Sequence, residues 1–159
     1  MKNKLWPLLA TFLVLSSVAL AASLVRSSDG SSVLAALKKL GYDATLEKSG
    51  AGVPQIRINA ANDYVIYLYF YDEDKHHPGY EGLQLSTSVS LDGAIDLDDL
   101  NYWNRQHRYA KVYQDGEDSV ALESDLDLAV GVVLNSALKE FMKKYLDNLD
   151  SFSLEIVGR

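Results

Sequence analysis

Residues 64–71 are eight consecutive apolar or aromatic residues, with Asn62 and Asp63 before them and Asp72 after them. Aromatic and β-branched residues favour extended backbone, and a short run that is apolar at every position is typical of a central strand covered on both faces. We therefore expect a strand whose more apolar face packs against helices. That face carries Tyr64, Ile66, Leu68 and Phe70, and the opposite face carries Val65, Tyr67, Tyr69 and Tyr71.

Strand patterns lie on both sides of this run, and helical patterns lie before, between and after them. Apolar residues alternate with polar ones, which is typical of half-exposed antiparallel strands, and Asp115-Gly116 is a hairpin signal. The predicted strands cover residues 42–47, 53–60, 63–71, 82–91, 109–114 and 119–126, and apolar stripes predict helices over residues 31–40, 97–107 and 132–147. The order α-β-β-β-(β)-α-β-β-α predicts an α+β fold, with a single antiparallel β-sheet and helices packed on one face.

Residues 1–21 have the pattern of an export signal. Lys2 and Lys4 precede an apolar run over residues 5–15, and Ala19 and Ala21 fit the small-residue rule for cleavage. We expect cleavage near Ala21, a flexible lead over residues 22–30, one domain over residues 31–159, a periplasmic or extracellular location and no stable membrane insertion afterwards. The alternative is an uncleaved anchor, because residues 5–24 are long enough to cross a bilayer.

Charge and cysteine content exclude several classes of function. The chain has 22 Asp and Glu against 15 Lys and Arg, and its net charge is −7 at pH 7. That sign opposes binding to nucleic acid and to anionic lipid, so no nucleic-acid partner is expected. The chain has no cysteine, so disulfides, thiolate metal sites and cysteine-dependent catalysis are excluded.

Two groups of residues are candidate partner-binding surfaces. Tyrosines combine an apolar ring with a polar tip, so the tyrosine face of residues 64–71 can bind a ligand; alternatively it packs under a loop, a helix or a second subunit. In residues 97–107, Asn101, Trp103 and Arg105 can form a recognition patch; alternatively Trp103 is a core anchor, and Asn101 and Asn104 bond to neighbouring backbone. The candidate partner-binding residues are Tyr67, Tyr69, Tyr71, Asn101, Trp103 and Arg105.

No recognisable catalytic motif is present, because the chain lacks a G-x-S-x-G elbow, an H-E-x-x-H helix and a P-loop. We expect no catalytic residue, no cofactor and no metal. Asp72, Asp74, His76 and His77 supply the argument for a metal, but adjacent histidines on an extended chain point apart, so a solvated loop is expected. The alternative function is a small-molecule-binding or metal-binding envelope protein with weak enzymatic potential.

Several short motifs carry a family resemblance. Residues 101–104, 108–110, 115–116, 120–122, 125–128 and 131–132 resemble the YbjN family, whose members are described as bacterial sensory transduction regulators. The resemblance is strongest over residues 100–152, and the family is similar in fold to type III secretion chaperones, small acidic proteins that dimerise and hold partner polypeptides. It implies that fold and a non-catalytic, chaperone-like or regulatory role, with a protein partner or the chain itself, as a homodimer, as the bound molecule. Many family members look cytosolic, whereas this chain carries an export signal.

Overall fold

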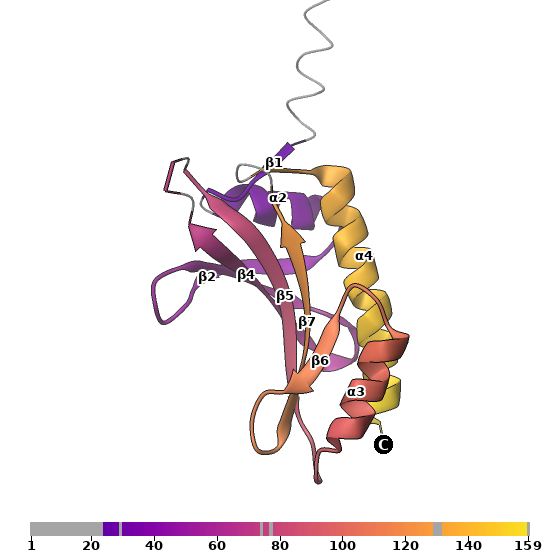
Figure 1. Cartoon of the computed structure of the whole chain (residues 1–159). Coiled ribbons are helices and arrows are strands. Elements are labelled where there is room, and N and C mark those ends of the chain that lie inside the picture. Colours follow the sequence, from indigo (N-terminus) through magenta and orange to yellow (C-terminus); the bar gives the residue numbers. More distant parts are fainter. Residues whose placement is uncertain (1–23, 29, 74, 77, 129–131, 159) are drawn as a thin grey trace, which may run out of the picture.

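Six antiparallel strands form the main sheet, in the order β2-β3-β4-β5-β7-β6. The computed structural model describes residues 24–28, 30–73, 75–76, 78–128 and 132–158, and Figure 1 shows their arrangement. The strands of this sheet are β2 (Asp43–Lys48), β3 (Pro54–Asn59), β4 (Val65–Glu73), β5 (Tyr80–Ser90), β6 (Lys111–Gln114) and β7 (Ser119–Asp127). A single 3-10 turn, η1 (Ala61–Asp63), connects β3 to β4.

Three helices cover one face of this sheet: α2 (Ser31–Lys39), α3 (Leu97–Gln106) and α4 (Asn135–Phe152). The predicted α+β class and the one-sided helical layer are therefore confirmed. On β4 the predicted faces are also correct, because Ile66, Leu68 and Phe70 are 1%, 0% and 4% exposed beneath the helices. Each such burial stabilises the fold by about 1.5–3 kcal/mol, so the alternation along β4 fixes which face the helices cover.

Helix α4 supplies the largest apolar stripe. Its buried side chains recur every three or four residues, which places them on one side of the helix. They are Leu138, Phe141, Met142, Tyr145, Leu149 and Phe152, with the polar Asn148 beside them. The helix ends in a π-helical turn, η2 (Ser153–Val157), which buries Ile156.

Helix α3 begins as its sequence predicts. The Asp96 carboxylate accepts a hydrogen bond from the Asp98 backbone N–H at 2.8 Å, and Asp98 and Asp99 lie in the first turn. Negative charge there favours the helix, because the free N–H groups make this end partly positive.

A second, two-stranded sheet is the main departure from the sequence prediction. Strand β1 (Leu24–Arg26) pairs with β8 (Val132–Leu134), so α4 begins at Asn135 and not at residue 132. The sequence pattern predicts residues 24–26 as part of the flexible lead, and the structure corrects this. The β-branched residues Val25 and Val133 favour extended backbone, and both are buried. Pairing of the two segments places these side chains at the same register position, which a helix beginning at residue 132 would not do.

Among the residues that the structure describes, no helix is both long and apolar enough to cross a membrane. Residues 1–23, which hold the predicted export signal and nearly all of the alternative anchor over residues 5–24, lie outside the described part of the chain.

Candidate functional site

The face of the sheet opposite the helices carries a row of tyrosines. Tyr67, Tyr69 and Tyr71, here called the tyrosine ladder, alternate along β4, and Tyr71 is 47% exposed. The rings of Tyr67 and Tyr69 stack with centroids 5.9 Å apart, and the rings of Tyr69 and Tyr71 meet edge to face at 6.2 Å. The three rings therefore form a continuous aromatic row. The described helices lie on the other face of the sheet (Figure 1), so none of them packs on this row.

A row of acids runs along the same face two strands away. Glu123, Asp125 and Asp127 alternate along β7 and are called the carboxylate ladder. Strand β5 lies between the two ladders, and its register places Ser86 between Tyr67 and Glu123, and Gln84 between Tyr69 and Asp125.

At the third register position β5 contributes a glycine. Gly82 pairs with Tyr71 on one side and with Asp127 on the other, so no side chain separates them. Gly82, Gln84 and Ser86 are called the β5 floor. Neighbouring strands lie about 4.8 Å apart, so the two ladders rise as walls from backbones about 10 Å apart, and the space between them is here called the trough.

Two adjoining hollows occupy this trough. One has a volume of about 730 Å³ and the other about 550 Å³, and both are lined by Tyr71, Gln84 and Glu123. Because the shared residues belong to the tyrosine ladder, the floor and the carboxylate ladder, the hollows form one continuous depression along β5.

Polar contacts fix the carboxylate wall. The Tyr113 hydroxyl donates to Glu123 at 2.7 Å, and the Lys111 ammonium lies 3.1 Å from the Glu123 carboxylate and 4.0 Å from that of Asp125. The Gln84 amide donates to Asp125 at 2.8 Å. Within the described part of the chain, Lys111 is the one cation paired with this ladder, so the wall keeps net negative charge.

Three tyrosines of the trough, Tyr69, Tyr71 and Tyr113, have a pKa above the ordinary value. Burial raises the pKa of Tyr69 and Tyr71 above the ordinary value of 10.0, and Glu123 and Asp125 raise that of Tyr71 further. For Tyr113, burial and the hydrogen bond to Glu123 raise the pKa strongly. Tyr69, Tyr71 and Tyr113 therefore keep their hydroxyl protons at neutral pH, and the carboxylate ladder beside them favours cations and hydrogen-bond donors over anions.

The second group of predicted residues does not come together at the surface. Trp103 is 1% exposed, and its ring stacks on His107 with centroids 4.2 Å apart, whereas Asn101 is exposed and the Arg105 guanidinium lies 5.7 Å from the Tyr102 ring centroid. This placement matches the alternative in which Trp103 anchors the core.

Asn104 bonds to backbone, as that alternative also expects. Its amide donates to the Val112 carbonyl and its carbonyl accepts from the Val112 N–H, both at 2.8 Å, so it joins α3 to β6.

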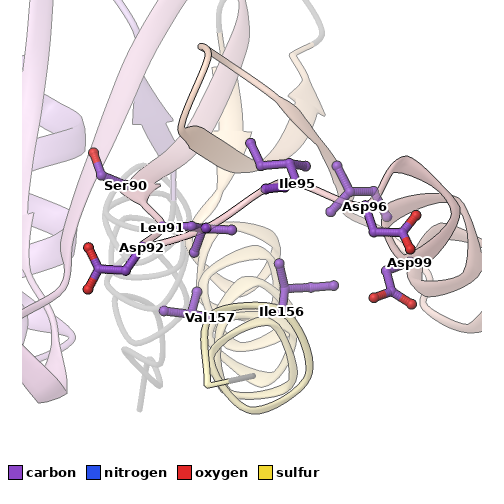
Figure 2. A pocket seen from close by; sticks show the side chains of 11 residues that line it. Ser90, Leu91, Asp92, Ile95, Asp96, Asp99, Ile156 and Val157 are labelled. Atoms are coloured by element: carbon purple, nitrogen blue, oxygen red, sulfur yellow. The ribbon is translucent and has the colours of Figure 1, made fainter.

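A smaller hollow lies between the β5–α3 connection and the C-terminal turn. Its volume is about 370 Å³. Figure 2 shows apolar side chains, among them Ile95 and Ile156, between Asp92 at one end and Asp96 and Asp99 at the other. The Asp96 carboxylate is already engaged as the cap of α3, so this hollow is the weaker candidate.

No group of three or more His, Cys, Asp or Glu side chains among the described residues is placed to hold a metal ion. Of the four loop residues considered for a metal, Asp72 and His76 are described and exposed, while Asp74 and His77 lie outside the described residues. The expectation that this loop binds no metal stays a prediction.

Sequence reasoning named one wall of the trough and missed the other. The carboxylate ladder was visible as acids at every second position of residues 123–127, which places them on one face of a strand. Only the pairing of β5 with β7 puts that face beside the tyrosines.

Comparisons with known proteins agree with this architecture. A family model named YbjN, described as "Putative bacterial sensory transduction regulator", matches residues 29–156. A solved structure of the Yersinia pestis type III secretion chaperone SycH, in complex with a stable fragment of YscM2, is similar with a TM-score of 0.52 and 16% identity, over 76% of this chain and 97% of that chain. At that identity the likeness shows the fold alone. A search of curated proteins finds no match to the chain.

Proposed function

The chain belongs to the YbjN family, and from that membership we propose that it is a non-catalytic binding or assembly module, chaperone-like or regulatory, which holds a protein partner in the trough on the open face of its sheet. The observation that carries this proposal is the tyrosine ladder, left uncovered beside a wall of acids. Tyr71 is exposed and Tyr67 and Tyr69 are half-buried. Aromatic side chains grouped in this way are typical of protein interfaces, where a few residues, often aromatic, carry most of the binding energy.

The shape of the trough supports a polypeptide as the ligand. Two adjoining hollows of about 730 and 550 Å³ form an open depression along β5, whereas a small molecule is usually enclosed on most of its surface. The similar chaperone SycH was solved with a protein fragment bound, which is a property of that protein and supports the same class of ligand here.

Export and self-association are further parts of the proposal. The pattern of residues 1–21 supports secretion across the inner membrane with cleavage near Ala21, and the family's chaperone-like fold supports a homodimer. Fractionation with N-terminal sequencing tests the first part, with a periplasmic or extracellular protein that begins at Ala22 expected. A membrane-bound chain that retains Met1 would overturn it. Light scattering tests the second part, and a monomeric mass at micromolar concentration would contradict it.

A capture experiment tests the binding role. The purified protein is used as bait on envelope extract, beside a Tyr69→Ala, Tyr71→Ala double variant and a Tyr102→Ala control. Tyr102 is 52% exposed on α3, so the control removes an exposed tyrosine from the helical side. We expect one or more proteins to be retained by the wild-type chain and the control and lost by the double variant. Equal retention by all three proteins would place binding elsewhere.

A further inference from the structure

We propose that the trough binds an extended basic segment of polypeptide, with Lys or Arg at alternate positions, that lies along β5 between the tyrosine and carboxylate ladders. This inference rests on the proposed function and adds the chemical class of the partner. It follows from the period of the two walls, from a cation already present at the rim, and from the charge of the chain.

The two ladders have the period of an extended chain. Neighbouring rings of the tyrosine ladder lie 5.9 and 6.2 Å apart, and Glu123, Asp125 and Asp127 occupy every second position of β7. Side chains at alternate positions of a strand repeat about every 6.6–6.8 Å. In an extended segment that lies along β5, every second side chain therefore faces the trough, and each of these side chains can lie beside one tyrosine and one carboxylate.

Lys111 shows how a cation sits at this wall. Its ammonium is 5.9 Å from the centroid of the Tyr113 ring and 3.1 Å from the Glu123 carboxylate. An ammonium or guanidinium between an aromatic ring and a carboxylate gains from the ring quadrupole and from the opposite charge. The trough repeats this pair of groups on a larger scale, with Tyr69 and Tyr71 facing Asp125 and Asp127 across the β5 floor.

Charge selects a basic occupant over an acidic one. The chain has a net charge of −7, and three carboxylates line a wall where Lys111 is the one paired cation among the described residues. Such a surface attracts cations over long range and repels anions. A second copy of this chain is disfavoured as the occupant, because a two-fold contact through the trough would bury two carboxylate ladders in one interface.

Fluorescence anisotropy with labelled peptides tests the proposal directly. The probe alternates Lys with Thr over 11 residues, to match the length of β5. One comparison peptide has the same composition with its lysines in a single block, and another alternates Glu with Thr. We expect the alternating Lys peptide to bind the wild-type protein more tightly than the block peptide, with an affinity that falls as salt is added. The Glu peptide is expected not to bind.

Matched variants locate the binding surface. A Glu123→Gln, Asp125→Asn, Asp127→Asn variant is expected to weaken binding of the Lys peptide about tenfold, because it removes three exposed ion pairs, each of which contributes little alone. A Glu140→Gln, Asp147→Asn, Asp150→Asn variant removes the same charge from α4 on the opposite side and is expected to bind as the wild type does. Lys111→Gln is expected to strengthen binding, because it removes the competing cation.

Three outcomes would overturn the inference. The first is that both triple variants lose affinity for the Lys peptide to the same extent, and the second is that the Lys and Glu peptides bind equally well. The third is that no peptide binds and the protein forms a dimer that Tyr71→Glu dissociates. Thermal melts of each variant separate loss of folding from loss of binding, and Lys111→Gln tests the opposite sign without removing a trough acid. If a protein is captured through the tyrosine ladder but the Lys peptide does not bind, the proposed function stands and this inference fails. If neither binds, both fail.

Discussion

The hydroxyl of Tyr145, on α4, lies 2.9 Å from the hydroxyl of Thr87, on β5. The same Tyr145 hydroxyl is 3.0 Å from the Leu122 carbonyl on β7. A phenol has one proton, so Tyr145 donates it to the carbonyl and accepts from Thr87. Both Tyr145 and Thr87 are buried. This polar contact in an apolar core links the main helix to the two strands whose opposite faces form the floor and the acidic wall of the trough.

Removal of that hydroxyl is expected to destabilise the protein. Tyr145→Phe removes the phenol that donates to the Leu122 carbonyl and accepts from the buried Thr87 hydroxyl, and the free energy of unfolding should fall by about 1–3 kcal/mol. Urea denaturation measures the change. Tyr102→Phe, at a half-exposed ring on α3, is the control and should change the free energy by less than about 0.5 kcal/mol. An unchanged Tyr145→Phe midpoint would mean that the hydroxyl contributes nothing net.

Stability is also expected to fall at alkaline pH. Burial raises the pKa of Tyr145 above the ordinary value of 10.0, so the folded protein holds this proton more tightly than the unfolded chain does. The stabilisation is complete below pH 10 and is lost as pH rises above it, by up to about 1.4 kcal/mol per pH unit for each such tyrosine. Urea midpoints across this range, followed with the tyrosinate absorbance, measure the slope. Tyr145→Phe should reduce it, and an unchanged slope would assign the effect to other tyrosines.

Asn104 provides a test of the joint between α3 and β6. Because it both donates to and accepts from Val112, Asn104→Ala should lower the free energy of unfolding by about 2 kcal/mol. Asn104→Asp should be at least as damaging, since a carboxylate cannot donate to the Val112 carbonyl and repels it. Asn101→Ala, at an exposed position of the same helix, is the control. Rescue by aspartate would show that only the accepted hydrogen bond matters.

A substitution at Gly82 can test ligand binding without lowering the stability of the fold. A Cβ at this position would meet the Tyr71 Cβ at 3.8 Å, an ordinary contact, and valine suits a strand better than glycine by up to about 1 kcal/mol. Gly82→Val should therefore keep or raise the melting temperature while it fills the gap in the β5 floor and abolishes capture of the Lys peptide. Gly93→Val adds the same side chain where nothing lies within 4 Å, and it should leave capture unchanged. Undiminished binding by Gly82→Val would place the ligand outside the trough.

Local patterns were enough to predict the helical layer and both faces of β4. Alternation along β4 predicted that Ile66, Leu68 and Phe70 face the helices, and Asp96 signalled the start of α3. These features depend on residues close together in sequence, where propensity, capping and periodicity act directly. The predicted start of α4, at residue 132, is wrong by three residues. Strand β8 pairs there with β1, more than a hundred residues away, and this tertiary pairing outweighs the local helical spacing.

The trough could not be predicted for a related reason. The sequence indicated the tyrosine ladder as a possible binding surface. That the acids of β7 belong to the same surface follows only from the pairing of β5 with β7. In sequence, the residues of α3 and β6 lie between those strands, and nothing local indicates that β6 takes the edge of the sheet while β7 moves inside it. The same non-local contacts bury Trp103, which sequence alone left open as either a surface or a core residue.

The strand order has a consequence for the timing of folding. Strand β7 is synthesised after β6 yet lies between β5 and β6 in the sheet. Until β7 pairs with β5, that edge of β5 is unpaired and the carboxylate ladder is not yet beside the tyrosine ladder. An open edge beside exposed tyrosines is the kind of surface through which nascent chains aggregate. Closure of that edge and completion of the trough are the same event. A chain able to hold a basic ligand is therefore one that has already finished its sheet, and ligand capture can serve as a readout of complete folding.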